Sequence, residues 1–262
     1  MKIPFCLPLI DKNVENEVHS CLNETGWLTT GPKVKLLEDE ITKLCQTNST
    51  ICVNSWTSGM LLLIRWLGLD EEDEIIVPTY TYAASAFSVI NSRVKCVFVD
   101  VNSDFTINID EVEKAITKNT KAIMPVDLGG LPADYLALNS LLTKESIKSK
   151  FIPKTDFQTK IGRPIVISDA AHSIGSLING IPTPLFSDFS VFSFHSVKNI
   201  TTGEGGAITF KIFNEEQDEL ILKELRLLSL NGQNKTAFEK NSIGGWKYDI
   251  TTNGLKVNMP DI

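Results

Sequence analysis

The chain has 262 residues, of which 42% are hydrophobic and 22% are charged, as in an ordinary soluble globular protein of one or two domains. Its formal net charge is −7 and no stripe of Lys and Arg runs through it, which argues against nucleic-acid binding. The simplest explanation of the acidic composition is that it keeps the protein soluble. No apolar run reaches the roughly 18 residues of a membrane span, and no basic segment followed by an apolar stretch opens the chain, so we expect a cytoplasmic protein that does not enter a membrane.

The five cysteines are odd in number and include no CxxC pair, which argues against a disulfide framework and against a zinc site. Cys52 and Cys96 lie within apolar runs, where a buried and unreactive thiol is the usual state. We therefore expect no metal in this protein.

Short β-rich apolar runs alternate with segments of helical spacing. Such alternation predicts βαβ units in an α/β fold with a mostly parallel sheet, and it places ligands at the carboxyl ends of the strands. The predicted strands are Thr50–Val53, Glu74–Val77, Lys95–Val99, Ala122–Pro125, Ile165–Ser168 and Ser190–Phe194, and the predicted helices between them are Met60–Leu69, Ala83–Asn91 and Ile109–Thr117.

The second half of the chain contains longer connecting segments. Thr143–Arg163 is polar and rich in Lys, which predicts a helix end followed by a surface loop. Phe213–Leu230 has the spacing of a long helix, and the Gly- and Asn-rich stretch Asn231–Gly254 is expected to be irregular. Leu255–Ile262 resembles the opening of a further element.

The first candidate for chemistry is the turn Asn54–Gly59, which lies between an apolar strand and an apolar helix. Its hydroxyl groups and free backbone N–H groups at a helix N-terminus favour a phosphate site. The alternative is simple N-capping by Ser or Thr, and the two interpretations are compatible. The turn is not a Walker loop, because it contains no GK[ST].

A second candidate follows the strand that ends near Val77. Tyr80 and Tyr82 lie just beyond it and could stack an aromatic face on a flat ring. Taken alone, this pair is explained as well or better by ordinary core or rim packing.

The third candidate is Asp169, at the end of the run IVISD, with His172 three residues later. A carboxylate in this place could hold the protonated ring nitrogen of a pyridine cofactor. The alternative is an Asp that caps a helix, and a metal site at these two residues would lack a third ligand nearby.

The fourth candidate is Lys198, in the segment Val191–Ile208, where a strand leads into a turn rich in Gly and Thr. A partly desolvated lysine has a lowered pKa, and its neutral amine is a nucleophile toward carbonyl groups. A surface lysine in a turn explains the spacing equally well.

Together and in this order, the four segments resemble the DegT/DnrJ/EryC1/StrS family of pyridoxal-phosphate (PLP) sugar aminotransferases. The chain's opening, including the stretch Gly26–Gly31 that lines the substrate cleft in that family, is also similar. The family patterns SxTxA, PxxT-aromatic, DAAH and SFHxxKxxTTGEGG are matched at Ser55–Ser58, Pro78–Tyr82, Asp169–His172 and Ser193–Gly206. The resemblance implies the fold type I large domain of aspartate aminotransferase, with three layers (αβα).

The resemblance also implies a role for each matched residue. Lys198 would hold PLP as a Schiff base and then move a proton, Asp169 would pair with the pyridine nitrogen, and His172 would lie near the ring. The ring face would be covered by Tyr82. The phosphate would be bound by Thr57, Ser58 and Ser193, and by Asn258 from the neighbouring subunit of a homodimer.

The implied reaction moves an amino group from an amino acid, expected to be glutamate, to a nucleotide-linked keto-sugar, in amino-sugar and surface polysaccharide (lipopolysaccharide) synthesis. A sugar dehydratase of the same fold is the less favoured alternative, because such enzymes carry histidine in place of Lys198. The sequence departs from the family pattern at Trp56, which replaces a small residue. Asp127–Gly130 replaces a His-x-aromatic-Gly pattern and Thr143–Arg163 is longer than usual, and these two departures bear on substrate shape or domain contacts.

Family members continue beyond the residues matched here into a small C-terminal domain. We therefore expect residues 1–254 to form the PLP-binding large domain, with 255–262 as the start of a truncated C-terminal region. A fragment that binds the cofactor without turnover is the alternative function.

Overall fold

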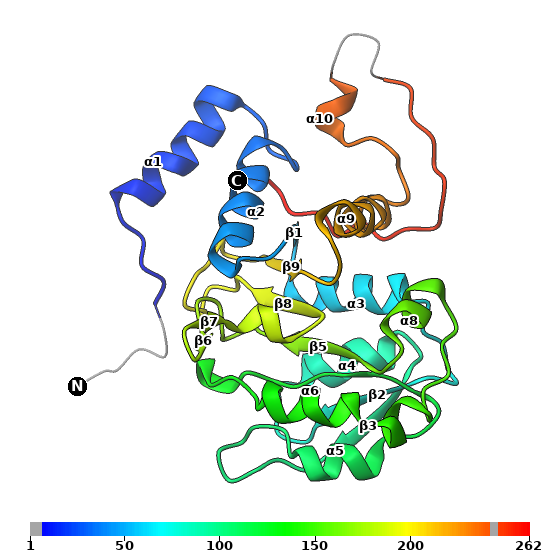
Figure 1. Ribbon diagram of the computed structural model, residues 1–262. Coiled ribbons are helices and arrows are strands. Elements are labelled where there is room, and N and C mark those ends of the chain that lie inside the picture. The colour runs from blue at the N-terminus through cyan, green and yellow to red at the C-terminus, as the bar shows by residue number, and fades with distance from the viewer. Residues whose placement is uncertain (1–6, 242–245) are drawn as a thin grey trace, which may run out of the picture.

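A central sheet of seven strands runs through the part of the chain that the computed structural model describes, residues 7–241 and 246–262 (Figure 1). The strand order is β1-β9-β8-β5-β4-β2-β3, and β6 pairs separately with β7. The strands are β1 (Ser49–Val53), β2 (Glu74–Pro78), β3 (Lys95–Val99), β4 (Thr120–Ile123), β5 (Ile165–Asp169), β6 (Leu177–Ile178), β7 (Ile181–Pro182), β8 (Phe189–Ser193) and β9 (Gly206–Phe210).

The sheet is parallel from β3 to β8, with β2 pairing in parallel with β3 and β4, and β5 pairing in parallel with β4 and β8. Only β9 runs the other way, antiparallel to both β1 and β8. Consequently β1, β2, β4, β5 and β8 end at the same edge. The α/β fold with a mostly parallel sheet is confirmed.

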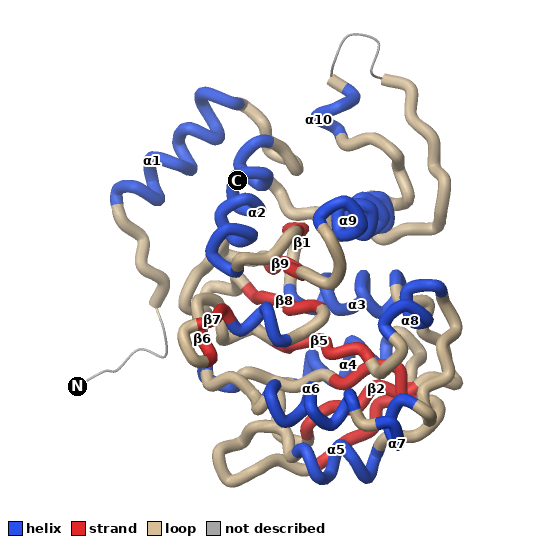
Figure 2. The backbone as a smooth tube through the Cα atoms, viewed as in Figure 1, coloured by secondary structure: helices blue, strands red, loops and turns tan. Residues whose placement is uncertain are grey.

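Helices cover both faces of this sheet (Figure 2). The helices are α1 (Lys12–Ser20), α2 (Pro32–Cys45), α3 (Trp56–Trp66), α4 (Ala83–Asn91), α5 (Ile109–Ala115), α6 (Tyr135–Thr143), α7 (Glu145–Lys148), α8 (Asp156–Ile161), α9 (Glu215–Ser229) and α10 (Ala237–Lys240). A π-helical turn at Cys21–Thr25 and 3-10 turns at Leu128–Gly130 and Thr183–Phe186 complete the set.

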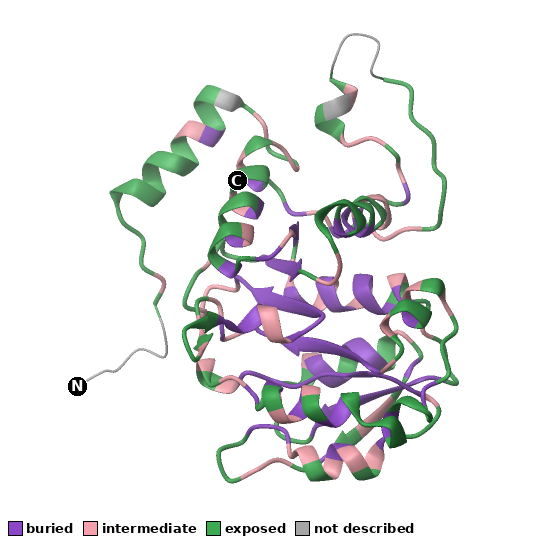
Figure 3. Cartoon of the chain, viewed as in Figure 1, coloured by how far each residue is buried: buried purple, intermediate pink, exposed green. Residues whose placement is uncertain are grey.

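Successive side chains along a strand point to opposite faces of the sheet, so the hydrophobic core is divided between the two faces. On one face, Ile75 and Ile165 pack in a cluster with residues of α3, α4 and α9. On the other face, Ile76 and Val166 pack with residues of α5 and α6, while Cys52 of β1 packs toward α2. Strands β1, β2, β4, β5, β8 and β9 therefore form a buried middle layer, which Figure 3 shows in purple, while β3 at the edge of the sheet is partly exposed.

The expectation that Thr143–Arg163 is a helix end and a surface loop is wrong for much of the segment, which contains α7 and α8. Thr155 caps α8 by accepting a hydrogen bond from Gln158 N–H, and Gly162 ends the helix at φ +66°. Phe157 of α8 packs against Trp66, with ring centroids 4.8 Å apart. A cap at each end of α8 and an aromatic contact thus stabilise a helix where the polar composition had predicted a loop.

The segment 255–262 packs on the large domain. Val257 and Met259 are buried, and the carboxylate of Asp261 accepts hydrogen bonds from the N–H groups of Gly31, Lys33 and Val34 at 2.8–3.0 Å. Because Gly31 has no side chain, Asp261 supplies the missing N-cap of α2 from the far end of the chain. The domain boundary at residue 254 stays a prediction.

Within the described residues, no helix combines the length and the apolar character that a membrane span requires. Cys52 is buried as expected, and burial raises the pKa of its thiol well above the usual value. Cys96 is half-buried, and its thiol pKa is raised by burial to about 11. Residues 1–6, which carry part of the resemblance at the N-terminus, lie outside the described residues.

Candidate active site

Five of the predicted site residues follow the carboxyl ends of strands. Thr57 and Ser58 lie in the first turn of α3 after β1, and Tyr82 precedes α4 after β2. Asp169 ends β5, and Ser193 ends β8. Because these strands run in the same direction, the fold brings the five residues to one edge of the sheet, where open α/β sheets bind ligands.

The first turn of α3 is arranged as an anion site. Ser55 is the N-cap, since its Oγ accepts a hydrogen bond from Ser58 N–H at 3.1 Å. The Ser55 hydroxyl in turn donates to Ser58 Oγ at 2.9 Å, so the hydroxyl proton of Ser58 remains available to an anion. Thr57 lies beside it, half-buried, and the helix N-terminus favours negative charge.

Gly206 brings the phosphate-binding candidates together. A Cβ at this position would lie 2.7 Å from the backbone N of Trp56 and 2.7 Å from the carbonyl O of Phe192. Gly206 pairs with Val53 on one side and with Ser193 on the other. Ser193 therefore lies within two strand spacings of the α3 turn, roughly 10 Å.

Asp169 is a buried carboxylate, with 5% of its surface exposed. Its Oδ2 accepts a hydrogen bond from Ser85 Oγ at 2.7 Å, and its Oδ1 accepts one from Ala171 N–H at 3.3 Å. Burial raises the pKa of Asp169 to about 6, although these two hydrogen bonds oppose the rise. The negative charge of Asp127 adds to the rise in this pKa, and the charge of Lys198 lowers it.

Lys198 lies in the loop that joins β8 to β9. Hydrogen bonds from Lys198 N–H to His195 O at 2.9 Å and from Thr202 N–H to Phe194 O at 3.0 Å close this loop on itself. Burial lowers the pKa of the Lys198 amine below its usual value, and the charge of Asp169 acts in the opposite direction. The lysine is half-buried, as a nucleophilic amine requires.

His172 connects the Lys198 loop to the loop after β4. Its Nδ1 accepts a hydrogen bond from Gly129 N–H at 3.2 Å, and its Nε2 lies 2.8 Å from Lys198 Nζ. Because a ring nitrogen that accepts from a backbone N–H carries no proton, the neutral imidazole has its proton on Nε2. That proton points at Lys198 Nζ, which can accept it only as an unprotonated amine. Burial lowers the pKa of His172 and favours this neutral form.

Tyr82 and Asn258 occupy the margins of this edge. Tyr82 is the residue before α4 and is 80% exposed, so its ring face is accessible to a ligand. Asn258 pairs with Val53 through an isolated β-bridge, and its side chain donates to Thr30 Oγ1 at 2.6 Å. The predicted contact of Asn258 with a neighbouring subunit stays a prediction.

The residues present fit a pyridoxal phosphate. Among residues 7–241 and 246–262, Asp169 forms no ion pair within 4 Å, so a protonated ring nitrogen would supply the positive charge that this buried carboxylate lacks. Lys198 offers for the aldehyde carbon an amine whose pKa is lowered by burial. The α3 turn and Ser193 offer donors for the phosphate.

Three contributors lie outside the residues predicted for the site. Ser85, on α4, donates a hydrogen bond to Asp169. The sequence feature that could have identified Ser85 is a hydroxyl side chain in an apolar helix, three residues after Tyr82. Gly129, at φ +63°, donates to His172, and Gly206 permits the close approach of the strands.

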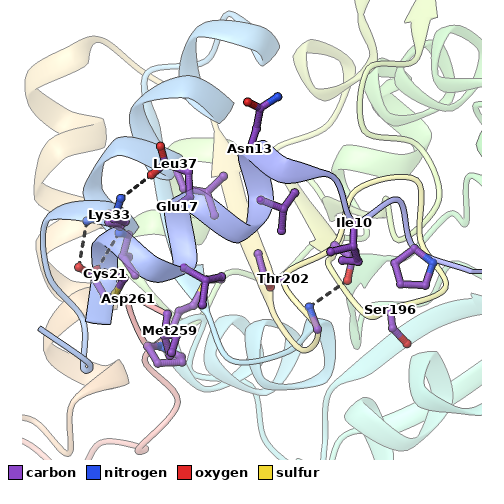
Figure 4. A pocket seen from close by; sticks show the side chains of 18 residues that line it. Ile10, Asn13, Glu17, Cys21, Lys33, Leu37, Ser196, Thr202, Met259 and Asp261 are labelled. Atoms are coloured by element: carbon purple, nitrogen blue, oxygen red, sulfur yellow. Dashed lines mark hydrogen bonds and ion pairs between the residues drawn. The ribbon is translucent and has the colours of Figure 1, made fainter. Parts of the chain in front are cut away.

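An apolar groove of about 540 Å³ lies on another side of the Lys198 loop, below α1 (Figure 4). Ser196 and Thr201–Gly203 line it from this loop, and Val34 and Met259 line it from α2 and the C-terminal segment. Lys198, Asp169 and His172 are not among its lining residues, so the chemistry is assigned to the strand ends and not to this groove.

The comparisons with known proteins agree with this geometry. A family model described as the DegT/DnrJ/EryC1/StrS aminotransferase family matches residues 8–150 and 158–262. The spore coat polysaccharide biosynthesis protein SpsC of Bacillus subtilis is 33% identical over 263 residues. The UDP-4-amino-4-deoxy-L-arabinose–oxoglutarate aminotransferase of Shewanella sediminis is 32% identical over 262 residues. Each match covers 99% of this chain and 61% of the relative.

Solved structures are similar over the whole chain. Spr1654 from Streptococcus pneumoniae in its PLP form has a TM-score of 0.92 at 40% identity, covering 100% of this chain and 64% of that one. Its PMP form gives 0.92 at 41% identity, covering 99% and 65%. PseC of Helicobacter pylori, an aminotransferase involved in the biosynthesis of pseudoaminic acid, gives 0.82 at 25% identity, covering 100% and 62%.

The chain thus spans 61–65% of the length of these relatives. The family resemblance and the fold type I assignment inferred from the sequence are confirmed, and so is the cofactor. The chain belongs to the DegT/DnrJ/EryC1/StrS aminotransferase family, whose cofactor is pyridoxal 5′-phosphate.

Proposed function

We propose that this protein is a PLP-dependent sugar aminotransferase that uses Lys198 as cofactor anchor and as proton carrier. The observation that supports this most directly is the 2.8 Å contact between Lys198 Nζ and His172 Nε2. In the tautomer fixed by Gly129, this contact requires an unprotonated lysine amine, which is the form that attacks a carbonyl carbon.

The cofactor, when bound, supplies a ring that withdraws electrons from the substrate carbon. Asp169 has the task of keeping the ring nitrogen protonated, and Ser85 orients its carboxylate. With the cofactor bound, the Lys198 amine would act as the general base at the substrate carbon. Tyr82 would cover one ring face, while Thr57, Ser58 and Ser193 would hold the phosphate.

The substrates we propose are glutamate as amino donor and a nucleotide-linked keto-sugar as acceptor. Support comes from the Shewanella relative, whose name pairs a UDP-amino sugar with oxoglutarate, the keto acid that glutamate becomes on losing its amine. SpsC supports a product that enters a surface polysaccharide. We further propose a homodimer in the cytoplasm, in which Asn258 reaches the phosphate bound by the partner subunit.

Half-reactions test this function without knowledge of the sugar. Protein loaded with PLP is mixed with glutamate, and its absorbance is followed for conversion to the pyridoxamine form. The proposal predicts conversion in the natural protein, none in Lys198→Ala, and normal conversion in Lys211→Ala, a control at an exposed lysine after β9. A panel of nucleotide-linked keto-sugars then tests which acceptor restores the PLP form. If the glutamate reaction ran equally well in Lys198→Ala, the assignment of Lys198 would be wrong.

The second candidate is cofactor binding without turnover. A dimer loaded with PLP that failed to convert with any amino acid would support this candidate.

A further inference from the structure

A second buried carboxylate, Asp127, lies one strand away from Asp169 and has no role in the function proposed above. Its side chain is 0% exposed, and within the described parts of the chain no Lys, Arg or His forms an ion pair with it. Its backbone N–H donates to Asp169 O at 3.1 Å, so the two residues are neighbours at the ends of β4 and β5.

Four hydrogen-bonding groups surround the Asp127 carboxylate. Oδ1 accepts from Ala133 N–H at 3.0 Å and lies 2.9 Å from the Tyr135 hydroxyl, whose single proton is shared between this oxygen and Ser168 Oγ at 2.6 Å. Oδ2 accepts from Ser168 Oγ at 3.1 Å and from Ser173 Oγ at 2.7 Å. A buried carboxylate with both oxygens hydrogen-bonded in this way is held rigidly, because moving it would leave several buried polar groups without hydrogen-bond partners.

Asp127 and Asp169 lie on opposite faces of the sheet. Ser168 points to Asp127, and Asp169, the next residue along β5, points to Ser85 of α4. Asp127 therefore cannot touch the cofactor from the side that Asp169 faces, and any effect it has on the reaction must pass through other residues.

The Asp127 carboxylate is hydrogen-bonded to two loops that meet at His172. It closes residues 127–133 by accepting from Ala133 N–H, and this loop carries Gly129, whose N–H donates to His172 Nδ1 at 3.2 Å. It also fixes Ser173, the residue directly after His172. The Asp127 carboxylate thus fixes both the backbone next to His172, through Ser173, and the loop whose Gly129 N–H binds the His172 ring.

We propose that Asp127 is a positioning residue for His172, which it holds in the tautomer and orientation that direct Nε2–H at the Lys198 amine. This inference rests on the proposed function of Lys198 and deepens it. Loss of the Asp127 carboxylate would release the Gly129 loop, allow the His172 ring to rotate, and remove the donor that stabilises the unprotonated amine.

The titratable groups around the pair are few. Asp169 and His172 face Lys198, and in the same loop His195 Nε2 lies 3.7 Å from Glu204 Oε1. Burial is the largest cause of the lowered pKa of His172. Asp127 acts by charge on the pKa of Asp169, which is why the test must separate a direct electrostatic effect from positioning.

Nitrogen NMR of the cofactor-free protein tests the positioning itself. The chain has three histidines, so the two ring nitrogens of His172 can be assigned with a His172→Gln variant. We expect an unprotonated Nδ1 and a protonated Nε2 in the natural protein, and a mixture of tautomers in Asp127→Asn and Ser173→Ala. Asp134→Asn is the matched control, since Asp134 only caps α6 and Asn caps equally well. An unchanged His172 tautomer in folded Asp127→Asn would overturn the proposal.

The rate of PLP capture by Lys198, followed by absorbance from pH 6 to 10, tests the consequence. Loss of one hydrogen bond to the neutral amine should raise the midpoint of the pH profile by about 0.5–1 pH unit in Asp127→Asn. In a His172→Ala background, Asp127→Asn should cause no further shift, because the residue through which it acts is gone. An equal shift in both backgrounds would show a direct charge effect and refute the positioning role.

Circular dichroism checks that each variant is folded, and Ser173→Ala keeps the test valid if Asp127→Asn is not, because it leaves both carboxylates in place. Failure of the proposed function is distinguishable, since it would show as absent capture at Lys198 in the natural protein. The NMR result does not depend on the cofactor.

Discussion

Replacing Asp169 by Asn should stabilise the cofactor-free protein at neutral and alkaline pH while it weakens the binding of the cofactor. Asp169 is 5% exposed, and no ion pair among the described residues compensates its charge. Among the residues that the structure describes, Ser85 and Ala171 alone donate hydrogen bonds to it. A buried and uncompensated charge destabilises the folded state, and at this site it is retained for a ligand that carries the opposite charge.

The magnitude follows from the pKa. Asp169 has a pKa of about 6 in the folded protein against 3.8 for an ordinary Asp, and the acid form is therefore favoured by folding. Because the folded-state pKa is the higher one, the stability contributed by this group is present below pH 3.8 and is lost as the pH rises through about 6. Relative to a side chain that stays neutral, this pKa shift lowers the free energy of unfolding by about 3 kcal/mol at pH 8 and by about 0.5 kcal/mol at pH 4.

Urea unfolding of the cofactor-free protein at pH 8 and pH 4 measures this directly. We expect Asp169→Asn to raise the free energy of unfolding at pH 8 by up to about 3 kcal/mol, and to leave it nearly unchanged at pH 4. Asp188→Asn is the matched control, because Asp188 is also buried but pairs with Arg163 at 2.8 Å, so its loss should destabilise at both pH values. No gain at pH 8, or a gain independent of pH, would refute the reasoning.

Three further substitutions probe the site and its support. Tyr82→Ala should weaken PLP binding about tenfold, the size of one ring-stacking contact, without changing the unfolding free energy, because the side chain is 80% exposed; titration of the cofactor-free protein checks this. Glu38→Gln should cost about 3–5 kcal/mol in urea unfolding, because Glu38 is 1% exposed and neutralises the largely buried Arg226. Gly206→Ala should lower the melting temperature and weaken phosphate binding together, because its Cβ would meet backbone atoms at 2.7 Å, whereas Gly203→Ala, in open space, should show only the strain of its positive φ.

The fold was largely predictable from local patterns. Lys95–Val99 and Ala83–Asn91 have the bounds expected from the apolar periodicity. The helix predicted from Met60 begins earlier, at Trp56, because Ser55 caps it. Strand β9 was missed because it opens with Gly206 inside a glycine-rich motif, and glycine weakens the strand pattern.

Candidate site residues could be chosen from the sequence, but the contacts between them and their partners could not. Asp169, His172 and Lys198 could be selected from motifs, yet their partners are distant in sequence. Ser85 contacts a carboxylate 84 residues later, and Gly129 contacts a histidine 43 residues later. These contacts depend on which strands are neighbours in the sheet, and no local pattern of the sequence encodes that order.

The central claim is that Lys198 is the residue that binds the cofactor covalently. The measurement that tests it most directly is borohydride reduction of the PLP-loaded protein, followed by mass mapping of its peptides. We predict a single reduced adduct, on Lys198, and loss of both the adduct and the absorbance of the bound cofactor in Lys198→Ala. An adduct on another lysine, or a Lys198→Ala variant that binds and absorbs like the natural protein, would contradict the account.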